Sequence, residues 1–231
     1  MGCEYAQNFM LNAPLSSGLH TTREILSVLR PDQVLCAGRI DEATHELADS
    51  MGISLIDFLD REELAVANAV AAAEGAIQLI MEETPITICH AGCLVIGFGR
   101  IGKILRHRLR GLGAKVTATA RNYADLAWIK AYGYEAEETG RIDDTLGQYD
   151  VVVNTVPARV LGEGRLSRLK RGCLCLDLAS KPGGMDFSAA SKLGVKAVWA
   201  LSLPGEVAPV TSGAIIRDTI FNILKEKGVT L

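Results

Sequence analysis

The segment that most restricts how this chain can fold is the run Gly97-Phe98-Gly99-Arg100-Ile101-Gly102, a complete G-x-G-x-x-G pattern. The apolar run Cys93–Ile96 precedes it, and residues 101–112 follow it with their apolar side chains at helical spacing. This order predicts a strand, a glycine turn and an amphipathic helix, which together begin a dinucleotide-binding unit of a parallel sheet.

Each glycine of the run has a physical role in such a unit. Gly97 allows the tight turn, Gly99 lets the backbone approach a pyrophosphate, and Gly102 lets the helix pack closely on the strand. The helix N-terminus adds unpaired N–H groups and a partial positive charge that attract an anion. We therefore predict that the six residues of the run bind a dinucleotide, the alternative being a glycine turn without a ligand.

From residue 93 onward, strands and helices alternate, which predicts an α/β fold with a doubly wound parallel sheet of the Rossmann type. The expected strands are 93–96, 115–119, 134–136, 150–154, 174–178 and 196–201. The expected helices are 101–112, 123–132, 164–169 and 186–193. This content is sufficient for a complete dinucleotide-binding domain.

Residues 1–83 predict a second, smaller α/β lobe. Its expected strands are 9–11, 33–36 and 53–56, and its expected helices are 21–29, 42–51 and the alanine-rich 61–83. A sheet of this size buries only a small core. We therefore expect this lobe to be truncated or to depend on a neighbour for its stability. The predicted parts are 1–83 with the connecting helix, 84–212 as the dinucleotide-binding domain, and 213–231 as a helix that crosses back to the first lobe, with a cleft between the lobes.

The composition excludes several classes of protein. The chain has 231 residues, of which 48% are hydrophobic, and a formal charge of −3, so no overall basic surface is present to bind nucleic acid. No apolar run reaches the roughly 20 residues that a membrane span requires, and no signal peptide follows Met1. We therefore expect a cytoplasmic protein with no membrane partner.

The six cysteines are expected to be reduced thiols in a buried core. The run Cys89-His90-x-x-Cys93 is the one zinc-like grouping, but Cys93 opens an apolar strand. We therefore predict no metal site.

Cofactor specificity is expected where the second strand of the domain ends, at Thr119-Ala120-Arg121-Asn122, about 20 residues after the glycines. An NAD-selective site usually has a carboxylate there, and this sequence has none before Asp125. The guanidinium of Arg121 matches a 2′-phosphate bidentately, and Asn122 offers an amide donor. These residues favour NADP, bound at Ala120, Arg121 and Asn122, with NAD as the alternative cofactor. In the other interpretation Arg121 is a solvated surface residue with no role in binding.

Three loops follow later strands, at Asn154-Thr155-Val156-Pro157, Asp177–Gly184 and Ser202-Leu203-Pro204-Gly205. Open α/β sheets bind their ligands at the carboxyl ends of the strands. We therefore expect further cofactor contacts from Thr155, Val156, Pro157, Ala179 and Pro204. The alternative is that the three loops are ordinary proline and glycine turns.

The second half of the chain resembles a known family. The runs Leu176–Phe187, Leu203–Pro209 and Thr211–Gly213, together with Gly97–Gly102, Asn154–Pro157, Pro14–Ser17 and Asp60-Arg61, are similar to the A subunit of dipicolinate synthase from spore-forming bacteria. The resemblance covers essentially the whole chain. It departs at the front, where family members begin with a further βαβ stretch, in line with the thin first lobe.

The resemblance implies an oxidoreductase of the lysine branch in sporulating cells. Such an enzyme oxidises dihydrodipicolinate or hydroxytetrahydrodipicolinate to dipicolinate (pyridine-2,6-dicarboxylate), with NADP accepting hydride. It also implies a partner, the B subunit, which resembles a flavoprotein, in the mother-cell cytoplasm, and we expect a homo-oligomer. For the substrate carboxylates we expect residues of both lobes, although Arg61 also fits a charged surface: Ser16, Ser17, Thr21, Arg61, Ser180 and Lys181.

Two other functions stay open. The chain could be a non-catalytic module that binds NADP and reports it to a partner. It could also be another two-lobe NAD(P)-dependent dehydrogenase of small carboxylic acids, although the usual His or Lys–Asp pair is not evident. The catalytic base is unknown: His20 is closest to the first-lobe loop, and solvent can accept the proton of a strongly downhill aromatisation.

Overall fold

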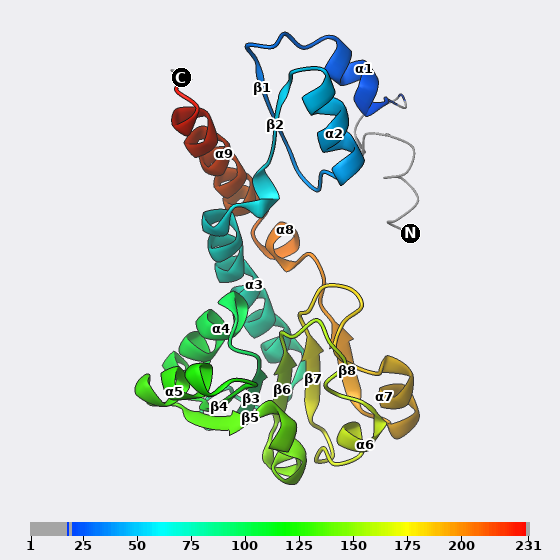
Figure 1. Ribbon diagram of the computed structural model, residues 1–231. Coiled ribbons are helices and arrows are strands. Elements are labelled where there is room, and N and C mark those ends of the chain that lie inside the picture. Colours follow the sequence, from blue (N-terminus) through cyan, green and yellow to red (C-terminus); the bar gives the residue numbers. More distant parts are fainter. Residues whose placement is uncertain (1–17, 19, 230–231) are drawn as a thin grey trace. The chain divides into compact units, whose positions relative to one another are not determined.

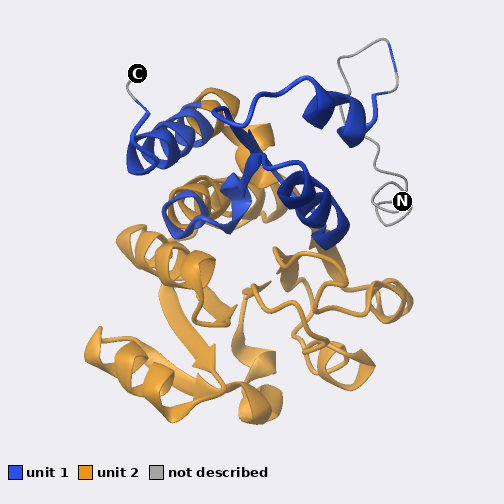
Figure 2. Cartoon of the chain, turned by 45° about the horizontal axis from the view of Figure 1, so that its top comes forward, with its two compact units in different colours: residues 1–65, 214–231 blue, residues 66–213 orange. Residues whose placement is uncertain are grey.

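The computed structural model describes residue 18 and residues 20–229 (Figure 1). The chain divides into two compact units, coloured separately in Figure 2. The smaller unit comprises residues 1–65 and 214–231, and the larger unit comprises residues 66–213. The expected strand at 9–11 lies outside the described residues.

The larger unit is built on a six-stranded parallel sheet in the order β5-β4-β3-β6-β7-β8. Its strands are β3 (Gly92–Ile96), β4 (Lys115–Ala120), β5 (Glu135–Glu138), β6 (Val151–Asn154), β7 (Leu174–Asp177) and β8 (Lys196–Trp199). The first strand in sequence is central, and the chain winds outward from it in both directions, so the topological switch point lies between β3 and β6. The predicted doubly wound sheet of the Rossmann type is confirmed.

Helices and 3₁₀ turns cover both faces of this sheet. In chain order they are α3 (Glu62–Glu83), α4 (Arg100–Gly111), α5 (Tyr123–Ala131), η3 (Thr139–Asp144), η4 (Leu146–Gln148), α6 (Glu163–Leu166), α7 (Phe187–Leu193) and α8 (Leu203–Val207). Along β3, Cys93 and Val95 pack with α3, α4 and α5, whereas Leu94 and Ile96 pack with η3, η4, α6 and α7. Apolar residues at consecutive positions are therefore buried on opposite faces, as expected of a central parallel strand.

One segment differs from its prediction. Residues 202–205 are expected to form a loop that contacts the cofactor, and the terminal helix is expected to begin at residue 213. Instead residues 202–213 contain α8 and the beginning of α9 (Pro209–Glu226). Proline fits the first turn of a helix because its missing N–H has no intrahelical partner there, and the Ser212 hydroxyl bonds the Pro204 carbonyl at 2.7 Å.

The smaller unit contains a two-stranded parallel sheet, β1 (Val34–Ala37) with β2 (Ser54–Asp57). Its other elements are α1 (Thr22–Ser27), α2 (Glu42–Ser50), η2 (Phe58–Asp60) and the C-terminal half of α9. Among the described residues, the buried cluster formed by α1, α2 and the segment before β2 comprises Leu26, Ala48 and Ile53, with five half-buried neighbours. These elements match the predicted βα pattern, and the core is small because two short strands bury little surface.

Helix α3 is long and apolar enough to cross a membrane by length and composition alone. The buried core helix of a soluble domain passes the same test. Here Ala73, Ala76 and Ile80 of α3 pack into the core of the larger unit. The apolar composition of α3 therefore has a structural explanation in this packing.

Three of the cysteines are buried in the larger unit, namely Cys93, Cys173 and Cys175, and Cys89 is exposed. Burial raises the pKa of the Cys93 thiol to about 12, which keeps it protonated and unreactive. Within residues 20–229 no cluster of metal-binding side chains occurs.

Candidate functional site

The glycine turn joins β3 to α4, and two of its glycines are required by the protein itself. Gly97 has a φ of 103°, and a Cβ there would stand 2.5 Å from the Thr155 hydroxyl oxygen. A Cβ on Gly102 would stand 2.3 Å from the Gly97 carbonyl oxygen. Helix α4 therefore approaches the end of β3 more closely than any side chain at either position allows.

Gly99 is different because nothing in the protein requires it. Its φ is −74°, which any residue adopts, and no heavy atom lies within 4 Å of the place where a Cβ would stand. Gly99 is the N-cap of α4 and forms no side-chain cap hydrogen bond. An anion fits this open space, because the N–H donors and the dipole of a helix N-terminus favour negative charge there.

The loop after β6 forms one side of this space. Thr155 donates its hydroxyl to the Ile96 carbonyl at 2.9 Å, which holds the loop against the end of β3. Val156 and Thr155 are half-buried, whereas Pro157 is exposed. The structure thus brings Thr155 and Val156 beside the glycine turn, against the position of Gly97.

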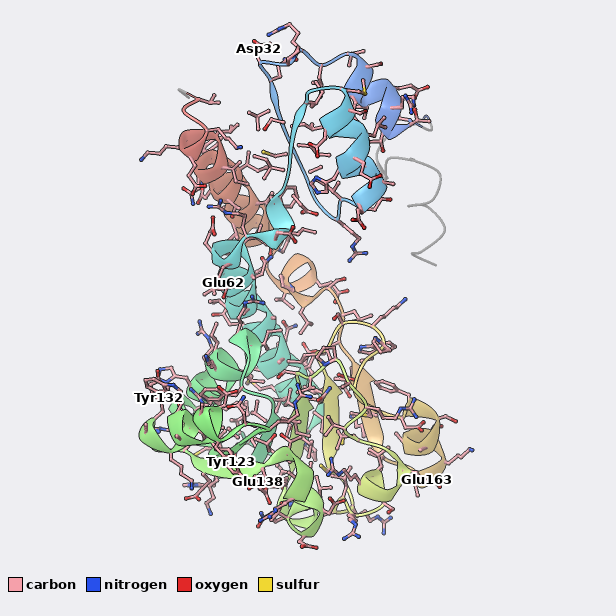
Figure 3. All side chains as sticks on the ribbon, in the orientation of Figure 1. Asp32, Glu62, Tyr123, Tyr132, Glu138 and Glu163 are labelled. Atoms are coloured by element: carbon pink, nitrogen blue, oxygen red, sulfur yellow. The ribbon has the colours of Figure 1, made fainter. Side chains whose placement is uncertain are left out.

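The end of β4 lies at the same edge of the sheet as the glycine turn, because β4 pairs in parallel with β3. Ala120 is buried, and Arg121 directly after it is exposed and forms no ion pair with the described residues. Ala120 pairs in register with Glu138, and that carboxylate already has Arg141 at 3.4 Å. Figure 3 marks Glu138 at the end of β5 and Tyr123 at the start of α5. Arg121 is therefore a cation that can meet a ligand beside the end of β4.

Asn122, predicted as a further cofactor contact, has a structural role. It caps α5, since its Oδ1 accepts the Asp125 N–H at 2.7 Å and its Nδ2 donates to the Asp125 carboxylate at 2.7 Å. One of the two N–H donors of its amide is therefore used within the helix cap.

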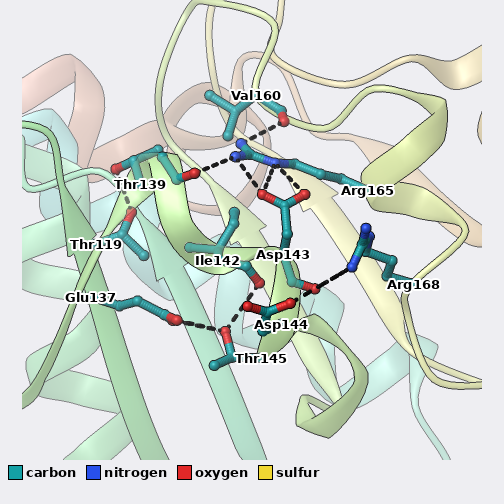
Figure 4. Close-up of polar contacts among 11 residues, drawn as sticks. Thr119, Glu137, Thr139, Ile142, Asp143, Asp144, Thr145, Val160, Arg165 and Arg168 are labelled. Carbon is teal, nitrogen blue, oxygen red and sulfur yellow. Dashed lines mark hydrogen bonds and ion pairs between the residues drawn. The ribbon is translucent and has the colours of Figure 1, made fainter.

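A polar network holds the segment that follows β5 (Figure 4). The Thr119 and Thr139 hydroxyls meet at 2.9 Å in a buried contact between the end of β4 and η3. Arg165 pairs with Asp143 at 3.0 Å and lowers the pKa of that carboxyl group. The segment that follows β5 is therefore held by the protein's own contacts (Figure 4).

The loop after β7 is anchored by the fully buried Asp177. Its carboxylate accepts the Asn154 amide at 2.8 Å and the Gly184 N–H at 2.7 Å. The Ala179 N–H reaches the same carboxylate at 3.1 Å, and the Ala179 carbonyl accepts the Trp199 indole N–H at 3.0 Å. Between these anchors the loop exposes residues 180–182.

Ser180 and Lys181 are thus exposed on a loop with a rigid base, at the same edge of the sheet as Gly99 and Arg121. Lys181 forms no ion pair with the described residues. Pro204, predicted as a cofactor contact, lies in α8 instead of a turn.

The candidate residues of the smaller unit are engaged locally. Ser16 and Ser17 lie outside the described residues. Thr21 caps α1 through a reciprocal pair of hydrogen bonds with Glu24. Arg61 forms two hydrogen bonds of 2.7 Å to Glu226 and a further contact of 2.7 Å to Glu63, which together raise the pKa of its guanidinium group.

Three polar residues with structural roles, Asp177, Asn154 and Thr139, were not predicted from the sequence. Asp177 and Asn154 end neighbouring strands, so the strand order contains the signal that brings them together. Thr139 follows β5, and its contact with Thr119 depends on the pairing of β5 with β4. A groove of about 680 Å³ between α3 and the C-terminal half of α4 lies at the opposite end of α4 from the glycine turn and does not belong to this site.

The geometry fits a dinucleotide: the N-terminus of α4 and the glycine turn lie at the switch point of a doubly wound sheet, and Arg121 is exposed at the end of the neighbouring strand β4. Residues 84–179 match the NAD-binding domain of D-isomer specific 2-hydroxyacid dehydrogenases. The larger unit is therefore a nicotinamide-dinucleotide-binding domain of the dehydrogenase type.

Three relatives refine this class. The chain is 34% identical to the A subunit of dipicolinate synthase from Bacillus subtilis (strain 168) over 193 residues, which are 84% of this chain and 65% of that protein. Two crystal structures of dipicolinate synthase A subunits are each 31% identical. The structure from Bacillus halodurans has a TM-score of 0.85, with 94% of this chain and 75% of that chain covered. The one from Bacillus subtilis has a TM-score of 0.87, with 95% and 74% covered. The chain belongs to the family of dipicolinate synthase A subunits.

Replacing Gly99 by valine tests the site without disturbing the fold. Its Cβ has no protein atom within 4 Å, so we expect the free energy of unfolding to change by about 1 kcal/mol or less, the size of an N-cap preference. The same side chain fills the space for the pyrophosphate, so dinucleotide affinity should fall about a hundredfold or more. Titration calorimetry measures this, and unchanged affinity in the folded variant contradicts the site.

Gly102→Ala is the matched comparison. Its Cβ would stand 2.3 Å from the Gly97 carbonyl oxygen, so α4 must shift. We expect the free energy of unfolding to fall by about 1–3 kcal/mol in urea titration. A fully stable Gly102→Ala protein would show that α4 does not pack on β3 as described.

Gly184→Ala tests the anchor of the β7 loop. A Cβ there would stand 2.2 Å from the Asn154 amide nitrogen and 2.7 Å from the Val156 carbonyl oxygen. We expect a loss of about 1–3 kcal/mol in the free energy of unfolding. Gly164→Ala is the control, because its Cβ meets nothing and alanine favours the helix by about 0.5–1 kcal/mol. Equal stability of the two variants contradicts the anchor.

Proposed function

We propose that this chain is the dinucleotide-binding subunit of a dipicolinate synthase, and that it oxidises dihydrodipicolinate or hydroxytetrahydrodipicolinate to pyridine-2,6-dicarboxylate with NADP as the hydride acceptor. The observation that supports this most is the open N-terminus of α4 beside Gly99, in a chain of this A-subunit family. The chain spans 65% of the length of its curated relative. The reaction is therefore proposed for this chain, not carried over from the relative.

The proposed reaction removes two hydrogens from dihydrodipicolinate. One leaves as hydride and one as a proton when the ring becomes aromatic, and a hydroxytetrahydro substrate also loses water. The nicotinamide ring of bound NADP supplies the hydride acceptor. The chain's part is to hold the pyrophosphate at α4 and to offer Ser180 and Lys181 to a substrate carboxylate.

The chain leaves the proton to solvent in this proposal. The two histidines of the larger unit lie away from the carboxyl edge of the sheet, His90 before β3 and His107 in the C-terminal half of α4. Asp177 at the edge already accepts three hydrogen bonds. Aromatisation favours loss of the proton without a positioned base.

NADP is proposed over NAD on the basis of Arg121. Its guanidinium is exposed at the end of β4 and has no carboxylate partner among the described residues. A 2′-phosphate offers it charge-assisted hydrogen bonds. The neighbouring carboxylate of Glu138 has its own counter-ion in Arg141, so it does not neutralise Arg121.

We also propose the setting of the enzyme. The curated relative is named as one subunit of its synthase, which supports a complex with a B subunit resembling a flavoprotein. A homo-oligomer and a place in the mother-cell cytoplasm of a sporulating bacterium complete the proposal.

A non-catalytic NADP-binding module is the second candidate. One observation favours it: Arg61, expected to bind a substrate carboxylate, is held by the carboxylates of Glu226 and Glu63. In that case the dinucleotide site works and the substrate site does not.

We expect NADP to bind about ten- to a hundredfold more tightly than NAD, since each charge-assisted hydrogen bond contributes about 1.5–3 kcal/mol and exposure reduces the sum. Arg121→Asp should reverse this preference by placing a negative charge against the phosphate. Lys115→Asp is the matched control, because Lys115 is exposed at the opposite end of the same strand. Equal affinities of the unmutated chain for both cofactors would exclude the role of Arg121.

The activity itself is tested with the chain alone and with the B subunit, using NADP and freshly prepared lysine-pathway precursor. We expect the ultraviolet absorbance of the pyridine dicarboxylate to rise together with NADPH. Tight NADP binding without either product would support the non-catalytic module, and NADPH formed only from other hydroxy acids would indicate a different dehydrogenase.

A further inference from the structure

Arg106 is the one basic side chain among the described residues that the structure buries, with 4% of its surface exposed. It lies in α4 on the same stripe as Gly102, Leu105 and Leu109, where an apolar residue is expected. Its guanidinium carbon stands 4.2 Å from the ring centroid of Phe98. The corresponding distances to Tyr134 and Tyr132 are 4.7 and 5.1 Å.

No carboxylate in the described part of the chain balances this charge. The Nε and Nη1 atoms of Arg106 are buried and have no hydrogen-bond partner. Burial lowers the pKa of the guanidinium, but arginine stays charged at neutral pH. The three aromatic faces offset part of the desolvation, yet a buried cation without an anion generally costs stability relative to an apolar residue.

The N-terminus of α4 is the candidate place for an anion that would balance the charge of Arg106. Side chains of a helix lean toward its N-terminus, and Arg106 contacts Phe98, which stands inside the glycine turn. From Gly99, the N-cap of α4, to Arg106 the helix rises by about 10 Å. The charge therefore lies below the open helix N-terminus, in a region where water does not screen it.

We propose that Arg106 is a positioning residue of the dinucleotide site: it supports Phe98 from below, and its buried charge attracts the pyrophosphate bound at the N-terminus of α4. The inference rests on the proposed dinucleotide binding and adds a residue to that site. Taking the axial rise of about 10 Å as the separation, two unit charges at an effective dielectric constant of 20–40 change an equilibrium by about four- to fifteenfold.

The test compares Arg106→Met, which keeps the bulk without the charge, with Arg106→Lys, which keeps the charge. Affinity for NAD is measured by titration calorimetry at pH 6, where the lysine carries its proton, and thermal unfolding verifies that each variant is folded. We expect Arg106→Met to bind NAD about four- to fifteenfold more weakly and Arg106→Lys to stay within about twofold of the unmutated chain. If Arg106→Met does not fold, the lysine variant alone decides.

Two controls separate the charge from general packing. Arg110→Met removes a cation that also stacks on Tyr134, at 4.8 Å, but is exposed and does not contact Phe98, so NAD affinity should not change. Adenosine, measured by NMR titration, carries no phosphate, so its affinity should be the same in all the variants.

The proposal is overturned if Arg106→Met binds NAD as tightly as the unmutated chain, if Arg106→Lys is impaired at pH 6, or if adenosine binding falls in parallel with NAD binding. Failure of the proposed function is distinguishable, because the unmutated chain would then bind neither NAD nor NADP.

Discussion

The close approach of α4 to the end of β3 is the contact from which the geometry of the larger unit follows. The Gly97 carbonyl oxygen occupies the place of a side chain at Gly102, so helix and strand meet without a layer between them. This contact aims the N-terminus of α4 at the switch point between β3 and β6, and Thr155 packs against the same turn. The open space at Gly99 and the buried charge of Arg106 acquire a function only because the helix is held there.

The carboxyl edge of the sheet combines buried, hydrogen-bonded anchor residues with exposed charged side chains. Asp177 and Asn154 fix the base of the β7 loop from inside the protein, while Lys181 remains in solvent. The Thr119–Thr139 contact holds the end of β4, which precedes Arg121, against η3 in the same way. A ligand at this edge meets positions that are already ordered, so little of its binding free energy is spent on ordering the site.

Local patterns in the sequence were sufficient for most of the larger unit. The glycine run, the apolar residues of β3 and the three valines of β6 predicted the strands, the turn and the helix to within a few residues. The alternation of strands and helices predicted the doubly wound sheet. Roles that depend on contacts distant in sequence were not predictable. The use of Asn122 as a helix cap, the pairing of Arg61 with Glu226, and the burial of Arg106 under Phe98 all depend on which side chains the fold brings together. Helix α8, which contains Pro204, and the first turn of α9 at Pro209 were missed because proline favours both turns and the first turns of helices.

The proposed function depends on a dinucleotide lying across the N-terminus of α4, and a crystal structure of the chain grown with NADP measures this directly. We predict pyrophosphate oxygens within hydrogen-bond distance of the first backbone N–H groups of α4, in the space beside Gly99. Density for NADP at any other place on the larger unit, with the N-terminus of α4 occupied only by solvent, would contradict it.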